Sequence, residues 1–160
     1  FADIRDGSSN TIMLGEIVKG DNNGASLDMQ RDVTDNLSTS GMASAFPTAD
    51  QIETAGIACD ANAPSFTASN AGFNYFGGFA CYGIFNTVTT PNWKHITCCT
   101  GTPFGYACDR DGIVPARSFH PGGANHAFGD ASVRFISNSI DLKTYQYLGA
   151  RDDGNAVSPP

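Results

Sequence analysis

Short apolar runs separated by turn-forming residues recur along the chain, and this pattern predicts strands more often than helices. Near the start, an Asp-Gly-Ser-Ser-Asn turn precedes three apolar residues, and β-branched residues follow shortly afterwards. We therefore expect a strand within residues 1–19. Side chains alternate along a strand, so Ile12, Leu14 and Glu16 are predicted to share one face. An edge position that lets Glu16 reach solvent is the simplest explanation for an acid there.

The clearest pattern lies in residues 113–136, where short apolar segments alternate with glycine-containing turns. It predicts a β-meander of three antiparallel strands, with a Pro-Gly turn after the first strand and Gly129-Asp130 between the last two. These two corner residues are expected to supply the positive φ that the connection needs. In the third strand, Val133 and Phe135 are predicted to face one side and the intervening residues the other.

The spacing of apolar residues changes after residue 138. Between 140 and 148 these residues recur at helical intervals, which predicts a short helix of about two turns. Asp141 is the expected N-cap and Gly149 the expected C-terminal cap. Residues 152–160 then form a predicted exposed tail. The fold class that follows is α+β, mostly β, with one short C-terminal helix.

The middle of the chain carries weaker signals. Residues 20–70 are polar, have few periodic apolar positions and contain Pro47 and Pro64 as breakers, so long loops with short strands are expected. Residues 72–88 interleave aromatic side chains with glycines, which is typical of a core that packs rings against backbone.

An exposed stacking platform for a sugar or a partner chain is the alternative for these rings. Phe79 and Tyr82, together with the single tryptophan, Trp93, are therefore the candidate interface residues.

Composition narrows the class of protein. The 160 residues, read as a single globular domain (1–160), include 18 glycines and only 16% charged residues, a profile typical of secreted β-rich proteins. A net charge of -7 argues against nucleic acid and against anionic membrane surfaces as partners. No apolar stretch reaches the roughly 18 residues of a spanning helix. Because the first residue is Phe1, we expect a mature or partial product.

Five cysteines lie in the middle of the chain, and none forms the C-x-x-C pattern of zinc or redox motifs. Neighbouring cysteines seldom pair with each other, because disulfide geometry needs more widely separated Cα atoms. We expect two disulfides and one spare thiol in an oxidising compartment, with about 15 connectivities open. The spare thiol would link subunits or be buried. The candidates are Cys59, Cys81, Cys98, Cys99 and Cys108.

Two histidines and an aspartate near the predicted meander are candidates for a metal site or a catalytic site. His120, His126 and Asp130 could hold a transition metal, and Asp130 could bind calcium together with turn carbonyls. A catalytic arrangement of Ser118, His120 and Asp130 is a further alternative, although no nucleophile elbow is present. The preferred interpretation is structural, with His120 donating to a turn carbonyl and Asp130 accepting backbone N–H groups.

Two motifs carry a resemblance to a known family. Residues 6–16, DGSSNTIMLGE, resemble the DGTSNTIMxGE motif of a large family of bacterial secreted prepilin-like proteins. That family is named for a His followed nine residues later by Asp-Gly, and His120 and Asp130 have this spacing, with Asn125 and Arg134 in the surrounding pattern. Ala131 departs from it, because the family usually has glycine there.

The resemblance implies a pilin-like head with an antiparallel sheet, export by a type IV pilin or type II secretion pseudopilin route, and no established enzymatic activity. The N-terminal pilin helix of such proteins is absent from this chain and would be its only link to a membrane. Relatives among the pseudopilins bind calcium in the corresponding region, so calcium at Asp130 is the one cofactor considered.

These observations predict a non-enzymatic, extracellular or cell-surface subunit that self-associates into a filament or array. A secreted glycan- or protein-binding module that uses the aromatic residues is the first alternative. A metal-dependent hydrolase that uses Glu16, His120, His126 and Asp130 is the second.

Overall fold

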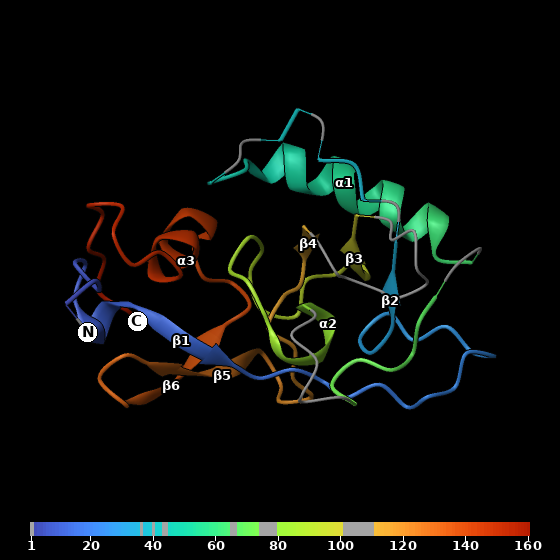
Figure 1. Cartoon of the computed structure of the whole chain (residues 1–160), viewed down its shortest axis with the longest axis horizontal. Coiled ribbons are helices and arrows are strands. Elements are labelled where there is room, and N and C mark those ends of the chain that lie inside the picture. The colour runs from blue at the N-terminus through green and yellow to red at the C-terminus, as the bar shows by residue number, and fades with distance from the viewer. Residues whose placement is uncertain are drawn as a thin grey trace.

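The computed structural model describes most of the chain, in seven segments: 2–35, 37–39, 41–42, 45–64, 67–73, 80–100 and 111–160, with residues 80 and 81 described by their backbone alone. These residues form two three-stranded sheets with helices packed against them (Figure 1). The predicted α+β, mostly β class is confirmed. Within the described residues, no helix combines the length and apolarity that crossing a membrane needs.

The first sheet, sheet A, combines one strand from near the start of the chain with two strands from its last third. It has the antiparallel order β1 (Ile12–Gly15), β5 (Gly123–Phe128) and β6 (Val133–Ser137). Helix α3 (Leu142–Leu148) lies over one face, which we call the inner face (Figure 1). The core between them buries Ile12, Phe128, Ile136, Tyr145 and Leu148.

Strand β1 contains a bulge that changes the predicted alternation. Ile12 pairs with Phe128 and Leu14 with Ala127, so Met13 is an extra residue in β1. As a result Ile12 is buried at 6% exposure while Leu14 is 67% exposed. The prediction that these two side chains share a face is wrong, because an inserted residue reverses the alternation that follows it.

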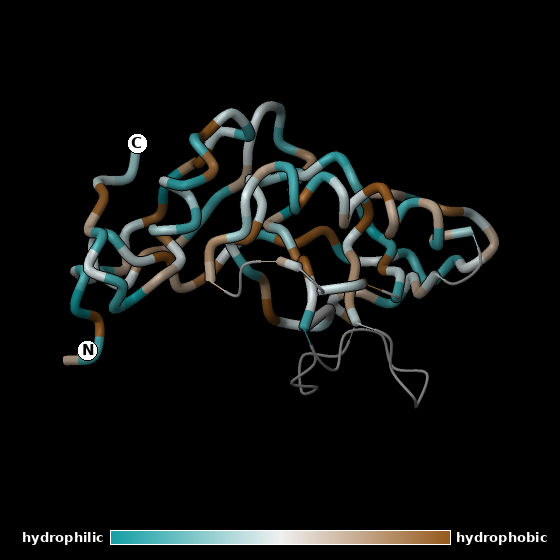
Figure 2. The backbone as a smooth tube through the Cα atoms, turned by 90° about the horizontal axis from the view of Figure 1, so that it is seen from above, coloured by the Kyte–Doolittle hydropathy of each residue, from teal (hydrophilic) through white to brown (hydrophobic). Residues whose placement is uncertain are grey.

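The second sheet, sheet B, has the mixed order β2 (Val33–Thr34), β3 (Thr97–Cys99) and β4 (Gly112–Ile113). Helix α1 (Ala49–Asn62) covers it (Figure 1). Two short helical segments, η1 (Ser8–Asn10) and α2 (Ala80–Gly83), complete the elements. Hydrophobic segments recur along the length of the molecule, in keeping with separate cores under the two sheets (Figure 2).

Helix α1 was not predicted. Thr48 and Gln51 form a capping box, in which each side chain accepts a hydrogen bond from the other residue's backbone N–H. Pro47 and Pro64 flank the helix at its two ends. Its buried positions, at intervals of three and four residues, are Ile52, Ala55, Gly56 and Cys59.

The predicted meander is correct for two of its three strands. β5 and β6 pair as expected, but β4 belongs to sheet B, and the third strand of sheet A is β1. The positive φ in the connection between β5 and β6 is at Ala131, with φ 66°, and not at Gly129 or Asp130. Local patterning could not identify β1 as the second partner of β5, because β1 lies more than a hundred residues away in the sequence.

The C-terminal helix agrees with its prediction. The Asp141 carboxylate accepts a hydrogen bond from the Thr144 N–H at 2.8 Å, and Gly149 is the C-cap. Gly149 does not have positive φ there. A Cβ at this position would lie 1.9 Å from the Thr87 hydroxyl, so close packing is what requires the glycine.

The first motif joins the two ends of the described chain. The buried Asp6 carboxylate accepts hydrogen bonds from the backbone N–H groups of Asp153 and Gly154, at 2.9 and 3.1 Å. The Arg5 N–H donates to the Arg151 carbonyl, so the N- and C-terminal segments lie side by side (Figure 1). The predicted tail is largely exposed, but its first residues are held by Asp6.

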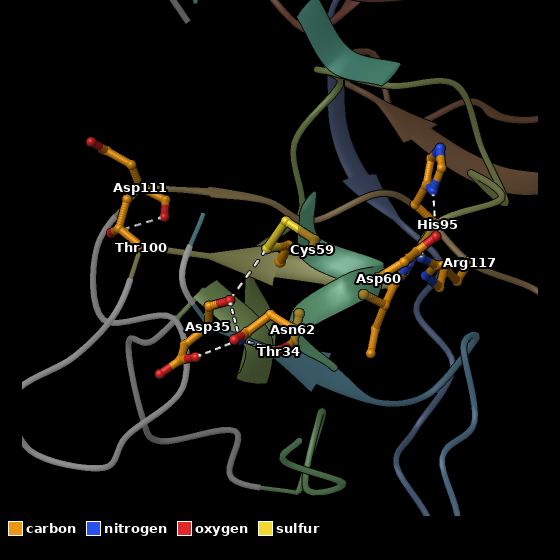
Figure 3. Close-up of a disulfide and its surroundings, with 11 residues drawn as sticks. Thr34, Asp35, Cys59, Asp60, Asn62, His95, Thr100, Asp111 and Arg117 are labelled. Carbon is orange, nitrogen blue, oxygen red and sulfur yellow. Dashed lines mark hydrogen bonds and ion pairs between the residues drawn. A yellow bond between two sulfur atoms is a disulfide. The ribbon is translucent and has the colours of Figure 1, made fainter. Parts of the chain in front are cut away.

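A disulfide between Cys59 and Cys98 joins α1 to β3 (Figure 3). This confirms that Cys98 does not pair with its neighbour Cys99, which is itself disulfide-bonded. The side chain of Cys81 and all of Cys108 lie outside the described residues, so the spare thiol stays a prediction.

Two of the three candidate interface residues belong to the core. Tyr82 and Trp93 are each only 9% exposed and pack in separate clusters of buried apolar side chains. Phe79 lies outside the described residues. Tyr82 and Trp93 therefore do not form an exposed aromatic platform, which was the alternative interpretation.

Candidate functional site

Three signature residues from distant parts of the chain meet at one end of sheet A. Glu16 follows β1, and its carboxylate accepts hydrogen bonds from the Asn125 backbone N–H at 2.8 Å and side-chain amide at 3.0 Å. The His120 Nε2 lies 3.5 Å from the same carboxylate. The His120 backbone N–H donates to the Ser118 hydroxyl at 3.0 Å. The two motifs are therefore halves of one cluster, which we call the Glu16 cluster.

The surroundings of Glu16 favour its charged form. Partial burial by itself would raise the pKa of Glu16, but hydrogen bonds from Asn125 and Ser118 and the charge of His120 lower it below its usual value. Each carboxylate oxygen already accepts a hydrogen bond from Asn125. The cluster is thus a set of satisfied groups that fixes the end of β1 against β5. The partner that the structure gives to the His120 ring is the Glu16 carboxylate, and not the turn carbonyl that was predicted.

Asp130 lies at the other end of β5, about 15 Å from Glu16 at roughly 3.3 Å per residue. Its carboxylate accepts hydrogen bonds from the Ser132 hydroxyl at 2.7 Å and the Ser132 N–H at 2.9 Å, and these lower the pKa of Asp130. Its own N–H donates to the Ser8 carbonyl. Asp130 therefore ties the β5–β6 turn to the first motif, and calcium binding there stays a prediction.

Arg134, the last signature residue, lies on the inner face of β6. Its guanidinium packs over the Phe128 ring, 5.0 Å from the ring centroid. It does not join the Glu16 cluster.

His126 is part of the core. It is 1% exposed, its Nδ1 lies 3.0 Å from the Ala124 carbonyl and its Nε2 lies 2.7 Å from the Tyr145 hydroxyl. Burial lowers the pKa of His126, so the ring is neutral at pH 7. Of the four residues of the hydrolase alternative, Glu16 and His120 therefore meet, whereas His126 is in the core and Asp130 lies at the other end of β5. Within the described segments, no group of three His, Cys, Asp or Glu side chains is placed to hold a metal.

A second histidine cluster, which the sequence did not reveal, joins α1 to the loop before β3. His95 Nδ1 lies 2.6 Å from the Asp60 carboxylate (Figure 3), and its Nε2 lies 3.2 Å from Glu53. The other Asp60 oxygen accepts the Ile96 N–H, and Glu53 also pairs with Lys94. The ring packs against Gly56, where any Cβ would overlap it, so this cluster positions the helix.

A solvent-open pocket of about 530 Å³ lies beside the Glu16 cluster. Sequence reasoning missed it, because its cationic residues Lys19, Arg31 and Arg117 are far apart in the chain and no motif connects them. Arg117 is 5% exposed and donates hydrogen bonds to the carbonyls of Trp93 and His95 and to the Thr97 hydroxyl. Figure 3 shows Arg117 beside His95 and Asp60.

Comparison with known proteins gave one result. A family model described as "Protein of unknown function (DUF1559)", SBP_bac_10, matches residues 1–143. No curated protein and no solved structure matches the chain.

Proposed function

We propose a structural function for this chain, which belongs to the DUF1559 family of proteins of unknown function. It acts as a non-enzymatic, extracellular or cell-surface subunit, with the head of a pilin or pseudopilin, and it packs against further copies in a filament or array. The observation that carries this proposal is the apolar face of sheet A opposite α3, which we call the outer face.

The outer face exposes large apolar side chains from two strands. Leu14 is 67% exposed, Val133 is 68% and Phe135 is 47%. Leu14 and Val133 both pair with Ala127 of the central strand, so these three form one row across the sheet. The uncovered face of an antiparallel sheet is normally polar. Apolar rows on it favour a protein partner.

A second copy of the chain is the partner that fits best. Two such faces can pack about 10 Å apart, with the side chains of one sheet between those of the other. The acids at the two ends of β5, Glu16 and Asp130, already accept hydrogen bonds within their own chain. Contact between two outer faces would therefore bury apolar groups without leaving these carboxylates unpaired.

Two further features support a structural subunit outside the cell. The signature residues Glu16, Asn125 and Asp130 hold β1, β5 and the β5–β6 turn together, and this use needs no substrate. The Cys59–Cys98 disulfide is typical of an oxidising compartment.

The test is assembly of the chain with a charge placed on the outer face. We expect the wild-type chain to self-associate with rising concentration in sedimentation velocity, and ordered polymers to appear in electron microscopy of native material. Val133→Asp should abolish both, because it would bury an unpaired carboxylate between two copies.

The matched control is Ile57→Asp, which changes a 58% exposed apolar residue on α1. It should assemble like the wild type. A wild-type chain that stays monomeric at high concentration and yields no polymer would refute the proposal, as would equal assembly by the Val133→Asp chain.

A further inference from the structure

The pocket beside the Glu16 cluster concentrates positive charge in an acidic protein. Three of the nine lysines and arginines line it, Lys19, Arg31 and Arg117, together with His120. Among the described residues that line it, Glu16 is the one carboxylate. Since the whole chain carries a net charge of -7, this pocket is a local site at which a negatively charged ligand is attracted.

Each of the three cations leaves room for a further anionic partner. The Lys19 ammonium lies 4.2 Å from the centroid of the Phe73 ring, and no carboxylate contacts it among the described residues. Arg31 pairs with Asp28 at 3.1 Å, but its side chain is 31% exposed. The buried Arg117 guanidinium donates its hydrogen bonds to neutral acceptors, and the charges of Asp28 and Asp60 act on it without a direct ion pair among the described residues. A buried cation that has no direct ion pair is stabilised by a further anion at the pocket.

The rest of the lining fits a hydroxylated ring better than a bare anion. Phe119 is 65% exposed at the pocket, with Arg31 5.1 Å from its ring centroid. An open aromatic face is a surface on which a sugar ring can stack. Glu16 and His120 add hydrogen-bonding groups that can contact hydroxyls. The volume of about 530 Å³ lies in the range of small-molecule sites.

We propose that this pocket binds an acidic saccharide, with a sugar carboxylate between Lys19 and Arg31 and a sugar ring against Phe119. The pocket adjoins the outer face at Glu16, but its lining includes none of the apolar residues Leu14, Val133 and Phe135, and binding there does not depend on self-association. It also uses none of the three aromatic residues that the sequence identified as candidates.

The experiment is isothermal titration of the full chain carrying Val133→Asp, so that assembly does not affect the result. The probes are trigalacturonate, a neutral galactose trimer and inorganic sulfate. We expect saturable binding of trigalacturonate, which weakens as salt is raised, and binding at least tenfold weaker for the other two probes. The double variant Lys19→Gln/Arg31→Gln should reduce affinity for trigalacturonate at least tenfold, and Phe119→Ala at least threefold.

Lys143→Gln is the matched control, because Lys143 also lies over aromatic rings, those of Phe46 and Tyr147, but far along the chain on α3. It should bind trigalacturonate like the parent chain. Absence of trigalacturonate binding, equal binding of sulfate or of the neutral trimer, or unchanged affinity in the double variant would each overturn the proposal. Unchanged circular dichroism in every variant ensures that lost binding is not lost folding.

Discussion

The carboxylate of Glu16 accepts two hydrogen bonds from Asn125, a residue 109 positions later in the sequence. Both lie at 3.0 Å or less, and both involve a charged acceptor, which makes them stronger than bonds between neutral groups. The contact joins the first sequence motif to the second and fixes the register of β1 against β5.

Glu16→Gln should therefore destabilise the chain by about 1–2 kcal/mol at pH 7, measured by urea unfolding. The pKa of Glu16 is lowered in the folded chain, so its contribution is complete above the unfolded value near 4.5 and is lost as pH falls through the folded value. The difference between wild type and variant should persist down to about pH 5 and shrink below that. Asp152→Asn, which changes an exposed ion pair with Arg5, should cost less than about 0.5 kcal/mol.

Asp6→Ala tests the connection between the two ends of the chain. Removing this buried carboxylate leaves the N–H groups of Asp153 and Gly154 without their acceptor, at an expected cost of about 1–3 kcal/mol. Amide exchange at these two positions should speed up selectively. Asp3→Ala, at an exposed position, should change neither quantity. Unchanged exchange at 153 and 154 in the Asp6 variant would contradict the role given to the first motif.

Ala131→Gly is expected to stabilise the protein. Ala131 has φ 66°, a conformation that costs an L-residue with a side chain about 1–2 kcal/mol and costs glycine almost nothing. The greater freedom of glycine in the unfolded chain offsets part of this gain, so we expect a net increase of about 0.5–1 kcal/mol in thermal or urea unfolding. Ala127→Gly, inside strand β5, should lower stability instead. A destabilised Ala131→Gly chain would show that the turn differs from the one described.

Removal of the Cys59–Cys98 disulfide should have the largest effect. The bond closes a loop with a sequence separation of 39, for which chain entropy predicts a contribution of about 4 kcal/mol. Replacing both cysteines by alanine tests this by denaturant unfolding, and it leaves Cys99 in place. Met13→Ala, at an exposed position, serves as the control. A loss below about 1 kcal/mol would mean that the two segments are already held together without the bond.

What could be predicted from the sequence is what depends on neighbouring residues. The C-terminal helix followed from Asp141 and Gly149, which lie directly beside it, and β5 and β6 followed from the glycine-containing turns around them. Helix α1 was missed because its apolar face is weak and includes Ala55 and Gly56, although the Thr48–Gln51 capping box was present in the sequence.

What could not be predicted depends on contacts between distant residues. Nothing near residue 12 shows that β1 pairs with β5, and nothing near residues 19 or 31 shows that both cations share a pocket with Arg117. The spacing of His120 and Asp130 identified the signature. It also suggested that the two side chains lie close together, which they do not. His120 contacts Glu16, while Asp130 contacts Ser132 and Ser8 at the opposite end of the strand.

The extra residue in β1 links the surface of the protein to its signature. If β1 kept all its residues but had no bulge, the pairing Ile12–Phe128 would place Leu14 opposite His126, on the inner face, and Glu16 would come one position too far along β5 to meet Asn125. The bulge therefore supports two properties at once, the apolar row on the outer face and the contact of Glu16 with Asn125. One irregular residue in an edge strand thus determines which side chains of β1 reach solvent.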